Sequence, residues 1–116
     1  YSNQDNVMVL SDVGLASSAT DGGLIVINNF SSVLSATANM GTIAMSNQVR
    51  IYGPNSLLGN PVDVAYDHVT NDIYVAERLN GGGQVLKFAF PTTNGDFAPQ
   101  TARNEAGVTA VYLLRR

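Results

Sequence analysis

The stretch Asn71–Ala76 (NDIYVA), which leads through a glycine-rich turn into Gly82–Phe90 (GGQVLKFAF), decides the fold. An earlier stretch has the same layout, since Asp5–Leu10 (DNVMVL) runs on to Gly22–Phe30 (GGLIVINNF). Each copy consists of a polar pair, an apolar strand, a glycine-rich turn and a second apolar strand, which is the pattern of a β-hairpin. A hairpin that recurs tens of residues later indicates a repeat architecture.

Tyrosines mark the same point in successive copies of this repeat. Aligning the hairpins places Tyr1 opposite Tyr66, and Tyr112 follows at the end of Val108–Tyr112 (VTAVY), which matches Val62–Tyr66 (VDVAY). The interval from Tyr66 to Tyr112 has the length of a propeller blade, about 40–50 residues in four strands. The sequence therefore predicts an all-β chain of four-stranded antiparallel β-propeller blades, about two in number and cut within a blade.

The short apolar segments divide this single propeller segment, residues 1–116, into unequal parts. We expect a partial blade with an insertion over residues 1–59, one blade over 60–106 and the inner strand of the next blade over 107–116. The insertion is rich in Ser, Thr and Asn, which are poor helix formers, so we expect irregular structure there with one extra strand at Thr42–Met45. A β-sandwich, in which the hairpins pair across two sheets, is the alternative architecture.

Three motifs of the second unit carry a resemblance to a known family. They are Asn60–Asp67 (NPVDVAYD), Thr70–Glu77 (TNDIYVAE) and Gln84–Phe88 (QVLKF), which together resemble one blade of the NHL-type repeats of secreted bacterial β-propellers. Glu77 stands where the family usually has Asp, and Gln84 stands where it often has Arg. The resemblance implies a propeller fold but no particular activity, because propellers host binders, enzymes and scaffolds alike.

Composition limits the classes of function. Only 13% of the residues are charged and the net charge is −3, which argues against nucleic acid as a partner because a phosphate backbone requires a basic stripe. The chain has no cysteine, so disulfides and thiolate chemistry are excluded. No apolar run reaches the ~18 residues that a membrane span needs. The lysine-poor composition, rich in Asn, Ser, Thr and Gly, favours a secreted or cell-surface location.

Asp63, Glu77 and Asn80 are the candidate metal ligands, and catalytic residues are not predicted. Asp63 lies on a predicted inner strand, Glu77 ends the next strand and Asn80 follows it. Calcium takes six to eight oxygen ligands, of which these side chains could supply a few. In the lactonase-like propellers to which the resemblance extends, axial acidic and amide groups hold a divalent cation. We expect instead that Asp63 points outward and Glu77 caps a turn, so that no cofactor is bound, and calcium is the alternative. His68, the single histidine, is expected to be an exposed turn residue.

These observations predict a non-catalytic propeller segment that serves recognition or structural assembly. The alternative is part of a metal-dependent, lactonase- or esterase-like propeller hydrolase. Two blades cannot close a ring, which takes about 4–8 blades. The apolar segment Val108–Leu114 would otherwise be an aggregation-prone edge. We therefore expect the partners to be other blades of a longer chain or copies of this chain.

Overall fold

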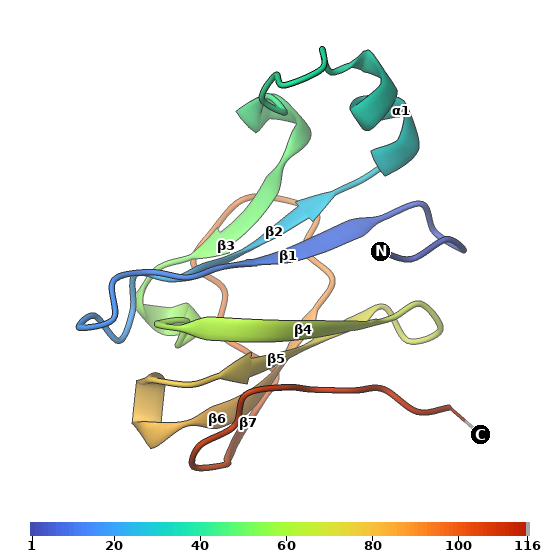
Figure 1. The fold of residues 1–116 in the computed structure, drawn as a ribbon. Helices are drawn as coiled ribbons and strands as arrows, with labels where there is room; N and C mark the ends of the chain where they lie inside the picture. The colour runs from blue at the N-terminus through green and yellow to red at the C-terminus, as the bar shows by residue number, and fades with distance from the viewer. Residues whose placement is uncertain (116) are drawn as a thin grey trace.

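The computed structural model describes residues 1–115 and contains two antiparallel sheets (Figure 1). The first has the strand order β1-β2-β3 and the second β4-β5-β6-β7, so each sheet is built from strands that are consecutive in the chain. The predicted all-β class is confirmed, and neither sheet closes on itself within the described residues. The strands are β1 (Met8–Asp12), β2 (Gly23–Ile27), β3 (Val49–Tyr52), β4 (Pro61–Asp67), β5 (Asp72–Glu77), β6 (Gln84–Ala89) and β7 (Thr101–Asn104).

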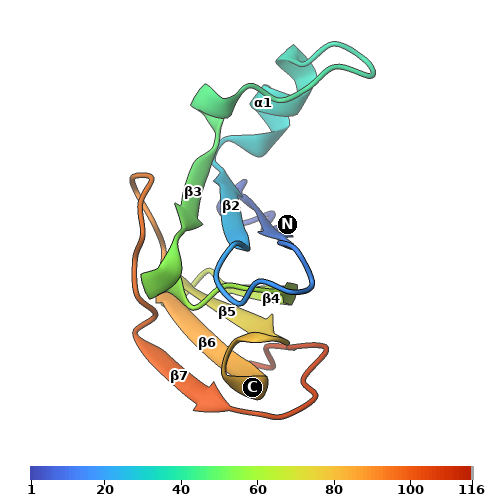
Figure 2. The same cartoon turned by 90° about the vertical axis from the view of Figure 1, so that its left-hand side faces the viewer.

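The core lies between the two sheets, which face each other and splay apart (Figure 2). Side chains alternate along a strand, so one face of each sheet supplies the apolar contacts. The sheets approach each other most closely at β1 and β4, which run side by side (Figure 1). The strand residues of the core, none more than 8% exposed, are Val9, Leu24, Val26 and Ile51 from the first sheet and Ile73, Val75, Leu86 and Phe88 from the second.

The insertion between β2 and β3 contains a helix, α1 (Phe30–Ala36), and no strand forms at Thr42–Met45, so the prediction for this segment was wrong. The helix buries none of its residues. Two hydroxyls bond back to the preceding turn: Ser35 in the helix donates to the Ser31 carbonyl oxygen, and Thr37, directly after the helix, donates to the Val33 carbonyl oxygen, both at 2.8 Å. Such local bonds allow residues of low helix propensity to close a short helix on the surface. No helix in the described part of the chain is long and apolar enough to cross a membrane.

Residues 108–115 run extended along the second sheet but form no strand, contrary to the strand expected at Val108–Leu114 (Figure 1). A strand needs a partner backbone to receive its N–H and C=O groups. Here the Val111 N–H instead donates to the Asp63 carboxylate, 3.0 Å away. The segment is therefore held by side chains of the second sheet rather than by pairing with another strand.

Candidate functional site

Each sheet carries the same cluster of a tyrosine, an asparagine and a phenylalanine, which we call the clamp. In the first sheet the Tyr1 hydroxyl donates to Asn6 Oδ1 at 3.1 Å, and the Phe30 backbone N–H donates to the Asn6 carbonyl oxygen at 3.0 Å. The rings of Tyr1 and Phe30 lie 5.7 Å apart at an angle of 53°. This tilted arrangement is one of the favourable geometries of an aromatic pair.

Tyr66, Asn71 and Phe90 form the clamp of the second sheet. The Tyr66 hydroxyl lies 2.8 Å from Asn71 Oδ1, and the Phe90 N–H donates to the Asn71 carbonyl oxygen at 3.0 Å. The two rings lie 5.5 Å apart at 51°. Asn71 and its counterpart Asn6 both adopt the left-handed backbone conformation, with φ of 56° and 53°, which asparagine tolerates better than most residues. The two sheets therefore share one local arrangement of contacts, in which Tyr1 and Tyr66 hold the same place.

Tyr66 also joins the two units. Its hydroxyl lies 2.7 Å from Asp5 Oδ2 in the turn before β1. A hydroxyl has one proton, and of the two acceptors the carboxylate is stronger than the Asn71 amide oxygen. Burial raises the pKa of Tyr66 to about 12, with further contributions from the hydrogen bond and the negative charge of Asp5. The Tyr66 hydroxyl therefore stays protonated and available as a donor to Asp5 at the contact between the two units.

The repeat also relates the faces of the two sheets. Aligning the two clamps makes Met8 the counterpart of Ile73. Met8 pairs with Ile27 on the neighbouring strand, and Ile73 pairs with Phe88 in the same way. The face that carries Met8 and Ile27 therefore corresponds to the face that carries Ile73 and Phe88. In the second sheet this face is buried against the first sheet. In the first sheet it points away from the second, and we call it the outer face.

The outer face of the first sheet is apolar and partly open. Leu10, which is 41% exposed, lines a cavity of about 360 Å³ together with Ile25 and Ile27. Arg50 and Asp12 form an ion pair on the same face, with 2.7 Å between Arg50 Nη2 and Asp12 Oδ2. Apolar surface rimmed by polar groups is typical of protein interaction sites.

The opposite end of the molecule, the far face of the second sheet, is covered by the chain's own C-terminal segment. Arg115 anchors the end of this segment to Asp67, with Nε donating to Oδ1 at 3.0 Å and a second contact from Nη2 to Oδ2. The Arg115 guanidinium holds the pKa of Asp67 well below its usual range. Tyr112 nevertheless remains 88% exposed. A cavity of about 270 Å³ separates the segment from the sheet, lined by Ala65, Tyr74, Val85, Val111, Tyr112 and Leu113.

Glu77 is fully buried and its two carboxylate oxygens accept hydrogen bonds from the backbone. The donors are the N–H groups of Gly59, Asn60, Leu79 and Asn80, at 2.8 to 3.0 Å. The first pair precedes β4 and the second belongs to the turn after β5. The carboxylate therefore fastens the chain between the two sheets to the β5–β6 hairpin.

The side chains of the other two candidate ligands, Asp63 and Asn80, form their hydrogen bonds with groups other than the Glu77 carboxylate. Asp63 accepts from the N–H of Val64 at 2.9 Å and from the C-terminal segment. The Asn80 side chain donates to the carbonyl oxygen of Ala19 at 2.7 Å. Within residues 1–115 no three His, Cys, Asp or Glu residues gather as a metal-binding group. His68 is exposed, as expected, in the turn between β4 and β5.

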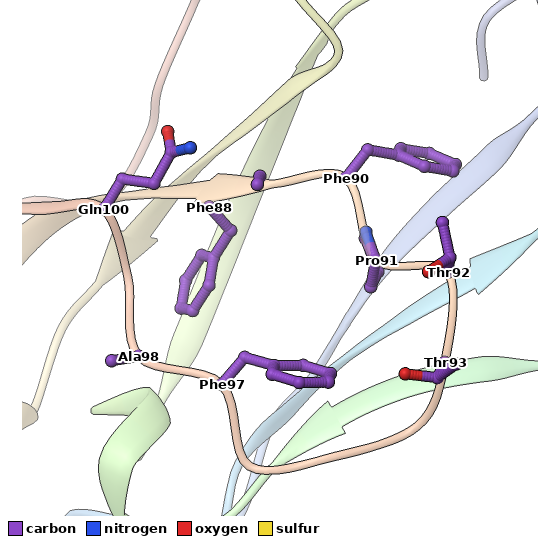
Figure 3. Close-up of a pocket in the computed structure, with 9 residues that line it drawn as sticks. Phe88, Phe90, Pro91, Thr92, Thr93, Phe97, Ala98 and Gln100 are labelled. Atoms are coloured by element: carbon purple, nitrogen blue, oxygen red, sulfur yellow. The ribbon is translucent and has the colours of Figure 1, made fainter.

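A third cavity, of about 370 Å³, lies inside the loop between β6 and β7 (Figure 3). The ring of Phe97 extends into the space enclosed by the loop, and the ring of Phe88 enters the same space from β6 (Figure 3). The residues that line it include no titratable side chain, so its chemistry is that of an apolar pocket rather than of an acid–base site. This cavity was not predicted from the sequence. The signal that could have indicated it is the group of aromatic residues Phe88, Phe90 and Phe97 around the turn-rich loop that begins at Pro91.

No family model, curated protein or solved structure matches this chain.

Proposed function

We propose that this chain is a non-catalytic arc of two successive β-propeller blades that serves recognition or structural assembly. The observation that carries the proposal is the clamp, which occurs once in each sheet with nearly the same distances and the same left-handed asparagine. A propeller is a radial repetition of one antiparallel unit. Two sheets that contain the same clamp fit such a repetition.

The arrangement of the sheets supports this proposal further. Each sheet is a meander of consecutive strands, and the chain passes from β3, at the edge of the first sheet, to β4, at the edge of the second. The two sheets meet at β1 and β4 and diverge toward β3 and β7 (Figure 2). Wedge-shaped packing of this kind suits sheets that radiate from an axis. In an aligned sandwich the two sheets stay about 10 Å apart along their whole width.

The roles of the carboxylates favour assembly over hydrolysis. Glu77 and Asp63 both accept hydrogen bonds from backbone N–H groups, so their oxygens contribute to holding loops in place. A lactonase- or esterase-like site would require these oxygens to bind a cation instead. We expect thermal unfolding to be the same in millimolar calcium and in a chelator. A calcium-dependent rise in the midpoint, together with ester hydrolysis, would favour the hydrolase.

The wedge can be measured with pairs of spin labels, since the chain has no native cysteine. One pair would be placed near the inner strands, at Leu10 and Val62, and a second pair near the outer strands, at Tyr52 and Arg103. The propeller arc predicts a clearly longer distance for the outer pair than for the inner pair. Equal distances would contradict the propeller and support a β-sandwich.

A further inference from the structure

We propose that the cavity inside the loop between β6 and β7 binds a small uncharged molecule with an apolar, ring-sized body and one hydrogen-bonding group. The residues that line this cavity all lie between Phe88 and Gln100, so one continuous segment of the chain builds the site. Such binding goes beyond the proposed function, and it does not require the two sheets to be propeller blades.

The middle of this loop is held against the first sheet. It runs beside β3 (Figure 2), where Gly95 forms a parallel bridge with Ile51. The Tyr52 N–H donates to the Gly95 carbonyl oxygen at 3.1 Å, and the Gly95 N–H donates to the Arg50 carbonyl oxygen at 3.0 Å. The Arg50 N–H donates to Asn94 Oδ1 at 2.8 Å. The loop thus extends the first sheet by a short stretch beyond β3.

Asp96 fixes the loop at a second place. Its carboxylate accepts hydrogen bonds from the N–H groups of Asn55 and Ser56, at 3.2 and 3.0 Å. Gly53 permits this approach, because a Cβ atom there would lie 2.5 Å from Asp96 Cγ. Contacts within the chain therefore shape the walls of the cavity before any ligand binds. A preformed site of this kind loses less conformational freedom on binding.

Aromatic and proline rings provide the apolar part of the cavity. Phe88 and Pro91 contribute buried surface, and the Phe97 ring extends into the space from the other limb of the loop (Figure 3). The Phe97 ring packs closely on Gly95, where a Cβ atom would lie 2.9 Å from Phe97 Cζ. Phe97 nevertheless remains 43% exposed. A ligand in the cavity would remove part of this ring from water, which favours an apolar body.

The polar groups that line the cavity are uncharged. They belong to Thr92, Thr93 and Gln100, and the Thr93 hydroxyl points into the space that the loop encloses (Figure 3). A hydroxyl can donate one hydrogen bond and accept two, so it suits a ligand with one polar group. A charged ligand would lose its hydration without meeting an opposite charge. The volume of about 370 Å³ is near the lower end for small-molecule sites.

Titration with benzyl alcohol, followed through the backbone amide resonances of the 116-residue chain, tests the proposal. This probe has one ring and one hydroxyl. We expect saturable shifts that are confined to residues 88–100. Benzoate is the matched probe, because it has the same ring and a negative charge. It should bind at least about tenfold more weakly, since the cavity offers its charge no partner.

Two variants assign the binding to the cavity. Phe97→Ala should weaken benzyl alcohol binding by about tenfold, because the ligand loses the ring that it covers. Thr93→Val keeps the shape of the side chain and removes its hydroxyl, so it should weaken binding by about threefold to tenfold. Val69→Ala is the matched control, since Val69 is 58% exposed in the turn between β4 and β5 and should leave binding unchanged. Circular dichroism checks that each variant is folded.

Shifts that do not saturate, or that spread evenly over both sheets, would overturn the proposal. Equal binding of benzoate would overturn the uncharged class of ligand, and unchanged binding by folded Phe97→Ala and Thr93→Val would overturn the site. None of these results would affect the propeller arc, because the spin-label distances are measured away from this loop.

Discussion

The hydroxyl of Tyr66 on β4 lies 2.7 Å from the carboxylate of Asp5 in the turn before β1, and it donates a hydrogen bond from one sheet to the other. The same tyrosine packs on Phe90 of its own unit. One side chain thus fastens a unit internally and joins it to the preceding unit. Tyr1, in the equivalent place, makes the internal contacts through Asn6 and Phe30.

Tyr66→Phe keeps the ring and removes the bond between the units. We expect a loss of about 1–2 kcal/mol in the free energy of unfolding, toward the lower end for a hydrogen bond to a charged group because this bond is exposed to solvent. Urea unfolding followed by circular dichroism measures it. Tyr1→Phe is the matched control, because within residues 1–115 the Tyr1 hydroxyl bonds to Asn6 alone and Tyr1 is more exposed, so the variant should cost less than half as much. Equal losses in the two variants would show that the Asp5 bond contributes nothing beyond the clamp.

The raised pKa of Tyr66 predicts a loss of stability in alkaline solution. The hydroxyl ionises near pH 10 in the unfolded chain and near pH 12 in the folded protein. The stability that the protonated Tyr66 hydroxyl contributes is therefore fully present below pH 10 and declines as the pH rises from 10 toward 12. Tyr66→Phe should show a shallower decline over this range. The pKa of Lys87 is raised by its bond to Asp72, so its contribution to stability also declines as the pH rises. This decline is the same in the unmodified chain and in Tyr66→Phe, and it cancels in the comparison.

The lowered pKa of Asp67 predicts the opposite dependence in acid. Its carboxylate stays charged in the folded protein at pH values where an unfolded aspartate, with a pKa of about 3.9, binds a proton. This contribution is present above pH 4 and declines as the pH falls further. Asp67→Asn and Arg115→Gln should each flatten the loss of stability between pH 5 and pH 2, since both remove the same pair. If Arg115→Gln keeps the steep acid limb of the unmodified chain, the C-terminal anchor does not form in solution.

Glu77→Gln tests whether this carboxylate holds the chain between the sheets. An amide offers one acceptor oxygen in place of two, so some of the four backbone donors lose their partner in a fully buried place. We expect destabilisation of roughly 2–4 kcal/mol, because buried unsatisfied groups and bonds to a charged acceptor are both involved. Glu105→Gln, at an exposed carboxylate after β7, is the control and should change stability by less than about 0.5 kcal/mol. Unchanged stability of the Glu77→Gln variant would be incompatible with the hydrogen bonds described here.

The strands could be predicted from the sequence because they depend on local patterns. Apolar runs and glycine-rich turns located both hairpins, and the alignment of the hairpins paired Tyr1 with Tyr66, which make similar contacts in the structure. The helix α1 could not be found in this way, because its side-chain bonds override the low helix propensity of serine and threonine.

The candidate site was harder to predict, because its features depend on contacts between distant residues. The acidic side chain of Glu77 suggests a cation site, but the donors that its oxygens meet come partly from Gly59 and Asn60, where the sequence predicts only a boundary between two units. The exposure of the outer face, where Leu10 lines the cavity, depends on what packs against each sheet. A sequence pattern identifies an apolar strand without saying which of its faces is covered.

Nuclear Overhauser contacts test most directly whether the two sheets repeat one structure. We predict ring-to-ring contacts between Tyr1 and Phe30 and between Tyr66 and Phe90, with slow hydrogen exchange at the amides of both phenylalanines. Contacts and protection at Phe90 alone, with Phe30 exchanging as freely as an unstructured loop, would contradict the repeat.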